Sequence, residues 1–158
     1  MTISNKGFSR RRFFKTLGKT AGYIALATSL PSIAWAKWSE KAFSSKTLDS
    51  AIKACFGDLP IADNPAVKLD VPDIAENGAM VGVGIKTELE NVKSVAVFVE
   101  KNPAPLCVKY NFGKGTIPDV ETRVRMGETS NLIAIVEADG KLHRSQKLVK
   151  VTIGGCGG

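Results

Sequence analysis

Hydrophobic and polar residues alternate with a period of two along most of the chain from residue 67 onward. In the segment 80–87, for example, valine and isoleucine alternate with glycine and lysine, which is the pattern of a strand with one buried face. The same reading predicts strands at 67–71, 80–87, 92–100, 104–112, 119–126, 131–138 and 141–153. Asp139-Gly140 between two apolar runs predicts a hairpin with a type I′ turn. The chain is therefore predicted to be mainly β, an antiparallel sandwich of immunoglobulin-like type with about seven strands over residues 58–153.

A helical period precedes the strands. Apolar side chains near one face of residues 38–56 predict one amphipathic helix, with Ser39 or Ser44 as its N-cap and Gly57 as its end. The face consists of Phe43, Leu48, Ile52, Cys55 and Phe56. We expect residues 37–57 to form an N-terminal helical segment ahead of the sandwich.

The first 36 residues follow the order of an export signal. Ser9–Lys15 holds three adjacent arginines, residues 21–27 are weakly apolar, and Ala34-Trp35-Ala36 is a small-x-small cleavage site. The arginines before Phe13 resemble a twin-arginine signal, which exports folded cargo. An uncut membrane anchor is the alternative, but the apolar run is shorter than the roughly 20 residues that span a bilayer. We expect residues 1–36 to be cleaved and the protein to reach the periplasm.

Removing that segment changes the charge. The whole chain carries a formal net charge of +7, with 22 basic and 15 acidic residues. Six of the basic residues and none of the acidic ones lie in residues 1–36. The remainder is nearly neutral and has no basic patch with interleaved aromatic residues, so nucleic-acid binding is not expected.

Candidate chemistry in the sandwich is sparse. The chain has three cysteines and one histidine, His143, so a two-histidine metal site is excluded and no cofactor or metal is predicted. Cys55 and Cys107 lie in apolar surroundings, which favours buried, inert thiols over a disulfide between them. We interpret His143 as an exposed strand residue. Gly82-Val83-Gly84 lacks the lysine and helix of a phosphate loop, and it indicates a bulge or the close approach of a partner surface.

The C-terminal residues Gly154-Gly155-Cys156-Gly157-Gly158 form the candidate functional segment. Bare backbone confers conformational freedom, and five extended residues place a sulfur on the order of 10 Å beyond the last anchored residue. Residues 154–158 are therefore predicted to be a swinging carrier arm with Cys156 as its thiol. A frayed terminus, or a cross-link between two chains, is the alternative. No neighbouring group would activate Cys156, so the protein is not expected to be an enzyme by itself.

Residues 149–158, the segment Pro72–Ala79 and the twin-arginine leader together resemble the SoxY family, the sulfur-carrier subunits of the bacterial Sox thiosulfate-oxidising system. The resemblance implies that Cys156 holds thiosulfate-derived S-thiosulfonate and persulfide groups, while Gly154, Gly155, Gly157 and Gly158 give the arm its reach. It also implies a heterodimer with a SoxZ-like sandwich subunit, and work with the cytochrome SoxXA, the hydrolase SoxB and, in some organisms, SoxCD. The alternative function is an exported immunoglobulin-like interaction module whose terminal cysteine forms a structural intermolecular disulfide.

Overall fold

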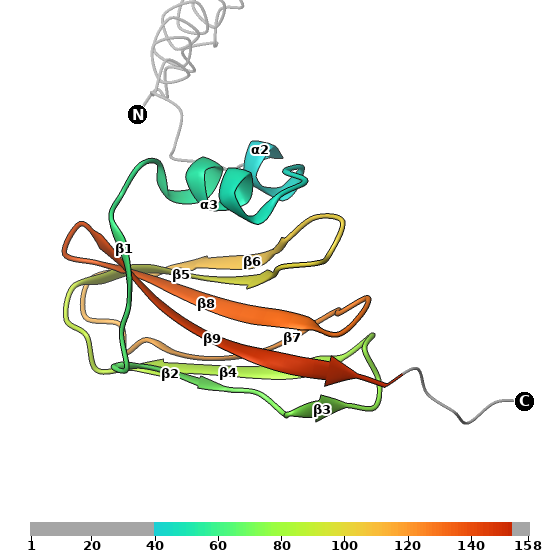
Figure 1. Ribbon diagram of the computed structural model, residues 1–158. Coiled ribbons are helices and arrows are strands. Elements are labelled where there is room, and N and C mark those ends of the chain that lie inside the picture. Colours follow the sequence, from blue (N-terminus) through green and yellow to red (C-terminus); the bar gives the residue numbers. More distant parts are fainter. Residues whose placement is uncertain (1–39, 153–158) are drawn as a thin grey trace, which may run out of the picture. The chain divides into compact units, whose positions relative to one another are not determined.

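The structure is a computed structural model that describes residues 40–152, and it contains two β-sheets packed face to face (Figure 1). The larger sheet has the strand order β1-β9-β8-β5-β6, with β3 also paired to β9. The smaller sheet has the order β2-β4-β7. The strands are β1 (Ile61–Asp63), β2 (Val67–Asp70), β3 (Ile74–Ala75), β4 (Val81–Thr87), β5 (Val92–Val99), β6 (Leu106–Asn111), β7 (Asp119–Val124), β8 (Ser130–Ala138) and β9 (Lys141–Val151).

The predicted β-sandwich is confirmed, and a strand occupies each of the seven predicted segments. The ends differ by a few residues, as in β6, which begins at Leu106 instead of residue 104. The hairpin between β8 and β9 turns at Asp139 and Gly140, whose φ angles of 49° and 73° are both positive. A type I′ turn requires positive φ at both central residues, so Asp-Gly fits this position.

Two short strands were not predicted, and both are parallel to β9. Ile61 in β1 pairs with Leu142 near the start of β9, and Ala75 in β3 pairs with Val151 at its end. Between them the chain crosses to the smaller sheet as β2, so residues 61–75 close one side of the sandwich. The predicted strands pair antiparallel as expected, and these two short additional strands add parallel pairs at the β9 edge.

The single helix predicted over 38–56 was also wrong. The described chain forms two helices, α2 (Glu40–Phe43) and α3 (Leu48–Phe56). The hydroxyl of Ser45 donates to the Lys41 carbonyl at 2.8 Å, and Thr47 caps α3 through a reciprocal capping box with Ser50. Hydroxyl groups that bond to nearby backbone compete with a continuous helix. The predicted end at Gly57 is confirmed, since its φ of 72° suits a residue without Cβ.

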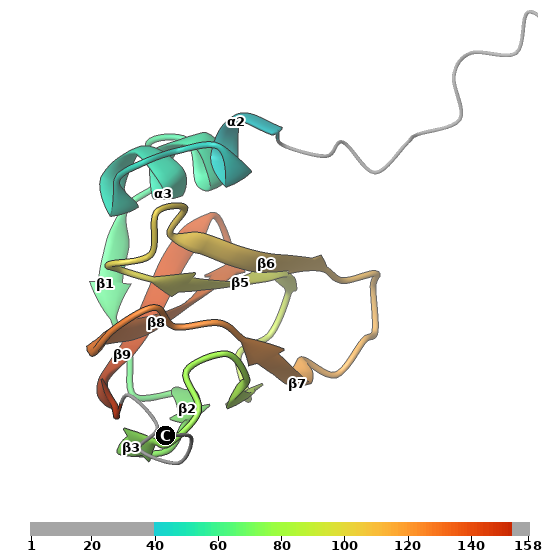
Figure 2. The same ribbon diagram turned by 90° about the vertical axis from the view of Figure 1, so that its right-hand side faces the viewer.

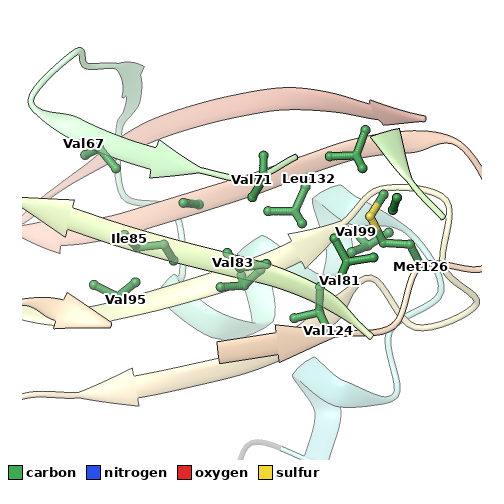
Figure 3. Packing of buried hydrophobic residues seen from close by; sticks show 14 of the residues in the cluster. Val67, Val71, Val81, Val83, Ile85, Val95, Val99, Val124, Met126 and Leu132 are labelled. Atoms are coloured by element: carbon green, nitrogen blue, oxygen red, sulfur yellow. The ribbon is translucent and has the colours of Figure 1, made fainter. Parts of the chain in front are cut away.

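The main core fills the space between the two sheets (Figure 3). Val83 and Ile85 from β4 and Val95 and Val99 from β5 are 3% exposed or less. They belong to one buried cluster with Val124, Met126 and Leu132. The alternating pattern of β4 thus reports a strand with one face in the core, as the sequence predicted.

A second core lies on the outer face of the larger sheet, beneath the helices (Figure 2). Phe98, Ile133 and Ile135 point to that side and pack with Ala51 and Phe56 of α3. Because the middles of β5 and β8 are buried on both faces, residues 95–99 and 132–136 are continuous apolar runs. No helix in residues 40–152 is long and apolar enough to cross a membrane.

Candidate functional site

The last described residues of β9 are held firmly by backbone hydrogen bonds. The Val151 amide donates to Thr129 Oγ1 at 3.0 Å, and the Thr152 amide donates to the Ala75 carbonyl at 3.1 Å. One step earlier, the Lys150 amide donates to the Asp73 carbonyl at 2.9 Å. The backbone is therefore anchored up to Thr152, two residues before the predicted arm. We call residues 149–152 the arm root.

The predicted carrier residues themselves, Gly154, Gly155, Cys156, Gly157 and Gly158, lie outside the described residues. The predicted export signal, residues 1–36, lies outside them as well. The structure therefore describes the residues that lead into the predicted arm. The assignment of Cys156 as the carrier thiol stays a prediction.

The arm root is buttressed by the segment 72–79. This segment contains β3 and the loop that leads into β4, and β3 pairs with Lys150 and Val151. One stretch that carried the family resemblance therefore lies beside the described beginning of another. Figure 1 shows β3 alongside the end of β9. Lys147 strengthens the contact, because its Nζ donates to the Val71 carbonyl at 2.8 Å and forms a salt bridge with Asp73 Oδ1 at 2.9 Å.

Gly78 allows the closest approach in this buttress. A Cβ at this position would lie 2.5 Å from the Met126 carbonyl oxygen and 2.8 Å from Val151 Cγ1. The Met126 amide donates to the Gly78 carbonyl at 2.7 Å. A methyl group there would push on the backbone at residue 126 and on the arm root together, so the position requires glycine for space. The sequence marked Asn77-Gly78 only as a turn, because close packing against a distant strand leaves no local signal.

Two apolar side chains are exposed beside the arm root. Ile74 is 56% exposed and Leu148 is 51% exposed. Ile74 pairs with Lys150, and Leu148 precedes Lys150 by two residues, so both side chains lie on the outer face of the larger sheet.

The two described cysteines are poor nucleophiles. Cys55 and Cys107 are both free and half-buried, in agreement with the preference for separate thiols over a disulfide. Burial raises the pKa of Cys107 to about 11, although a hydrogen bond from Asn102 acts in the opposite direction. Burial also raises the pKa of Cys55, and the positive charge of Lys109 partly offsets it. Burial therefore favours the protonated form of both thiols, which is the less nucleophilic form.

The side chain of His143 contacts the side chain of Asn64. It lies on β9, half-buried, with Nδ1 3.0 Å from Asn64 Nδ2, so the interpretation as an exposed residue was only partly right. Within residues 40–152 no group of three or more histidine, cysteine or carboxylate residues could hold a metal ion.

These features define a class of protein, a β-sandwich in which the end of the longest described strand is held firmly by neighbouring backbone. The two described thiols of this sandwich have raised pKa values. The family model described as "Sulfur oxidation protein SoxY" matches residues 52–156. The chain is also similar to the sulfur carrier protein SoxY from Chlorobium limicola f thiosulfatophilum, at 40% sequence identity and a TM-score of 0.63. That match covers 68% of this chain and 97% of the Chlorobium chain. No curated protein sequence matches. The chain belongs to the SoxY family of sulfur oxidation proteins.

Proposed function

We propose that this protein is a periplasmic carrier that holds thiosulfate-derived sulfur covalently on Cys156 and presents it to partner enzymes. The observation that carries the proposal is the buttressed arm root, where segment 72–79 fixes β9 up to Thr152. A rigid base followed by glycines lets a thiol move while the body of the protein stays in place. The family match extends through residue 156, which supports Cys156 as the attachment point.

The loading step needs an external oxidant. Thiosulfate and the Cys156 thiol form one S–S bond to give an S-thiosulfonate, with release of the thiol proton and two electrons. A SoxXA-type cytochrome would accept the electrons. Hydrolysis by a SoxB-type enzyme would then add water across the S–SO₃ bond, releasing sulfate and leaving a persulfide. A SoxCD-type enzyme could oxidise that sulfur further, so the carrier needs no catalytic group of its own.

The other assignments follow from the same function. Export through the twin-arginine route would deliver the protein folded, together with a SoxZ-like sandwich subunit bound to it. The raised pKa values of Cys55 and Cys107 support a single carrier thiol, because thiolates are the reacting form. Such a protein acts as the covalent substrate carrier of a multi-enzyme system and is not an enzyme by itself.

Intact-mass analysis tests the proposal. The mature protein is incubated with thiosulfate and the SoxXA-type cytochrome of the same organism, and the modified peptide is then mapped. We expect one thiosulfate adduct on the peptide that contains Cys156, none in Cys156→Ser, and an unchanged adduct in the double variant Cys55→Ala/Cys107→Ala. An adduct on Cys55 or Cys107 would contradict the carrier assignment. A stable disulfide dimer that takes up no thiosulfate would favour the structural cross-link instead.

A further inference from the structure

The end of β9 extends beyond the strand with which it pairs for most of its length. The ladder between β8 and β9 ends at Ser130 and Val149, and the residues of β9 after it pair with β3. Strand β3 pairs with no other described strand. Residues 150–152 and β3 therefore form a two-stranded extension of the larger sheet (Figure 1). We call this part of the molecule the β3–β9 extension.

Thr129 supplies a hydrogen-bond acceptor that the backbone of β8 does not. Amides two residues apart on a strand face the same neighbour, so the Val151 amide points toward the β8 side. Strand β8 begins only at Ser130, and the Val151 amide donates instead to Thr129 Oγ1 at 3.0 Å. Within the described chain, this is the only hydrogen bond that joins residues 150–152 to a part of the protein other than segment 72–79.

The backbone on both sides of Thr129 is itself held in place. Two residues before it, the Gly127 amide donates to the side-chain oxygen of Asn102 at 3.1 Å. One residue after it, the Ser130 hydroxyl accepts from the Lys101 amide at 3.0 Å. Threonine is branched at Cβ, so its side chain has few rotamers. The hydroxyl of Thr129 therefore has a fixed position, and it can fix the position of the chain that bonds to it.

The other contacts of the β3–β9 extension either run through segment 72–79 or are apolar. Ala75 is 6% exposed and belongs to the main core, against which Val151 also packs. Apolar contacts of this kind have no preferred direction, whereas a hydrogen bond weakens steeply when its angle departs from linearity. The bond to Thr129 therefore sets the direction in which β9 leaves the sandwich.

We propose that Thr129 is a positioning residue of the carrier, whose hydroxyl fixes the point and the direction from which the Cys156 thiol is presented to the enzymes that act on it. The role of Cys156 rests on the proposed function. With the bond to Thr129 in place, residues 153–156 connect the anchored backbone to the sulfur. Without it the β3–β9 extension can move, and the connection lengthens to residues 150–156. The effective concentration of a tethered group falls roughly as the −3/2 power of tether length, so the thiol becomes about twofold more dilute at a partner's site.

The test compares Thr129→Val, which removes the hydroxyl, with Thr129→Ser, which keeps it. Loading of Cys156 with thiosulfate by the SoxXA-type cytochrome of the same organism is followed by mass over a range of carrier concentrations. We expect Thr129→Val to lower kcat by about twofold and to leave KM unchanged, because the body that docks is the same. Thr129→Ser should load as the unchanged protein does. So should the matched control Thr116→Val, in an exposed loop, whose hydroxyl makes no hydrogen bond within the described residues.

Two further readouts separate positioning from a general loss of structure. Alkylation of Cys156 by iodoacetamide requires no docking, so its rate should be equal in the unchanged protein and the three variants. Hydrogen exchange of the Val151 amide should accelerate about fivefold in Thr129→Val, which lacks the acceptor, and should stay unchanged in Thr129→Ser. Unfolding curves verify that all variants fold.

Three outcomes would overturn the proposal. The first is an unchanged kcat in Thr129→Val, and the second is an equal loss of kcat in Thr129→Ser. The third is unchanged exchange of the Val151 amide in Thr129→Val. If the unchanged protein takes up no thiosulfate on Cys156, the carrier function fails and the role of Thr129 in presenting the thiol fails with it. Loading of the unchanged protein therefore distinguishes a failed carrier function from a failed positioning role.

Discussion

The two outer faces of the sandwich differ in how they are completed. The larger sheet turns Phe98, Ile133 and Ile135 outward, and α2 and α3 cover them so that all three are 2% exposed or less. The smaller sheet turns glycines and charged side chains outward, and no described element covers them. The first face is covered within the chain, while the described residues leave the second face open. Substitutions on the two faces should therefore affect different properties.

The largest expected effect is on the covered face. Phe98→Ala removes a fully buried ring between β5 and α3, and truncations of this kind cost about 3–5 kcal/mol. Met80→Ala changes an exposed side chain beside the smaller sheet, whose outer face we call the bare face. It should change the free energy of unfolding by less than about 0.5 kcal/mol. Urea denaturation of both variants measures the difference. Equal losses would show that the bare face also belongs to the folding core.

Ionising the partly buried Cys107 thiol in the sandwich should lower the free energy of unfolding, whereas charged side chains on the outer face of the smaller sheet are already exposed to solvent. Because burial raises the pKa of Cys107 to about 11, the folded state holds the thiol proton more tightly than the unfolded state. Its contribution to stability is complete below the unfolded pKa of about 8.5 and is lost as the pH rises through 11. We expect the unfolding free energy to fall over this range by up to roughly 3 kcal/mol.

Cys107→Ala isolates this effect from the titration of lysine and tyrosine. The difference in unfolding free energy between the variant and the unchanged protein should shrink steadily from pH 8.5 to 11, and it should be constant from pH 6 to 8. Denaturation in urea at each pH gives the values. A difference that does not depend on pH would mean that the thiol is solvated in the folded protein.

The sequence predicted the strands well because alternation is a local property. Every strand of four or more residues was found, including β4 and the doubly buried β5 and β8. Strand β1, with the pattern Ile61-Ala62-Asp63 and all three residues exposed, had no such signal. It exists through pairing with β9, some 80 residues away. The division of strands between two sheets is likewise a matter of distant pairing, so the covered and bare faces could not be told apart beforehand.

The candidate site divides in the same way. The sequence alone predicted residues 154–158 as the carrier arm, and it also showed the resemblance of segment 72–79 to the family. That segment 72–79 pairs through β3 with residues 150 and 151 of β9 was not predicted, because parallel pairing over 76 residues leaves no periodicity. The helix break at Thr47 was missed for a different reason, since the serine and threonine hydroxyls compete for backbone groups that the helical pattern assumed were paired.

A medium effect is expected where a glycine serves the chain itself. Gly78→Ala would place a methyl 2.5 Å from the Met126 carbonyl oxygen, and overpacking of this kind costs about 1–3 kcal/mol. The same displacement should loosen the arm root, because Val151 Cγ1 lies on the other side of the methyl. Hydrogen exchange of the Val151 and Thr152 amides should therefore accelerate. Unchanged exchange together with unchanged stability would remove Gly78 from the buttress.

The smallest effect has the opposite sign and separates the two faces most sharply. Gly82→Ala adds a methyl to open space at a φ that alanine adopts without strain. The substitution restricts the unfolded chain more than the folded one, so it should stabilise the protein by about 0.4–1 kcal/mol. Thermal unfolding of Gly82→Ala and Gly78→Ala side by side measures the contrast between two glycines only four residues apart. If Gly82→Ala is destabilising by as much as Gly78→Ala, the strand needs this glycine for its own fold. No approaching molecule is then required to explain why glycine occupies this position.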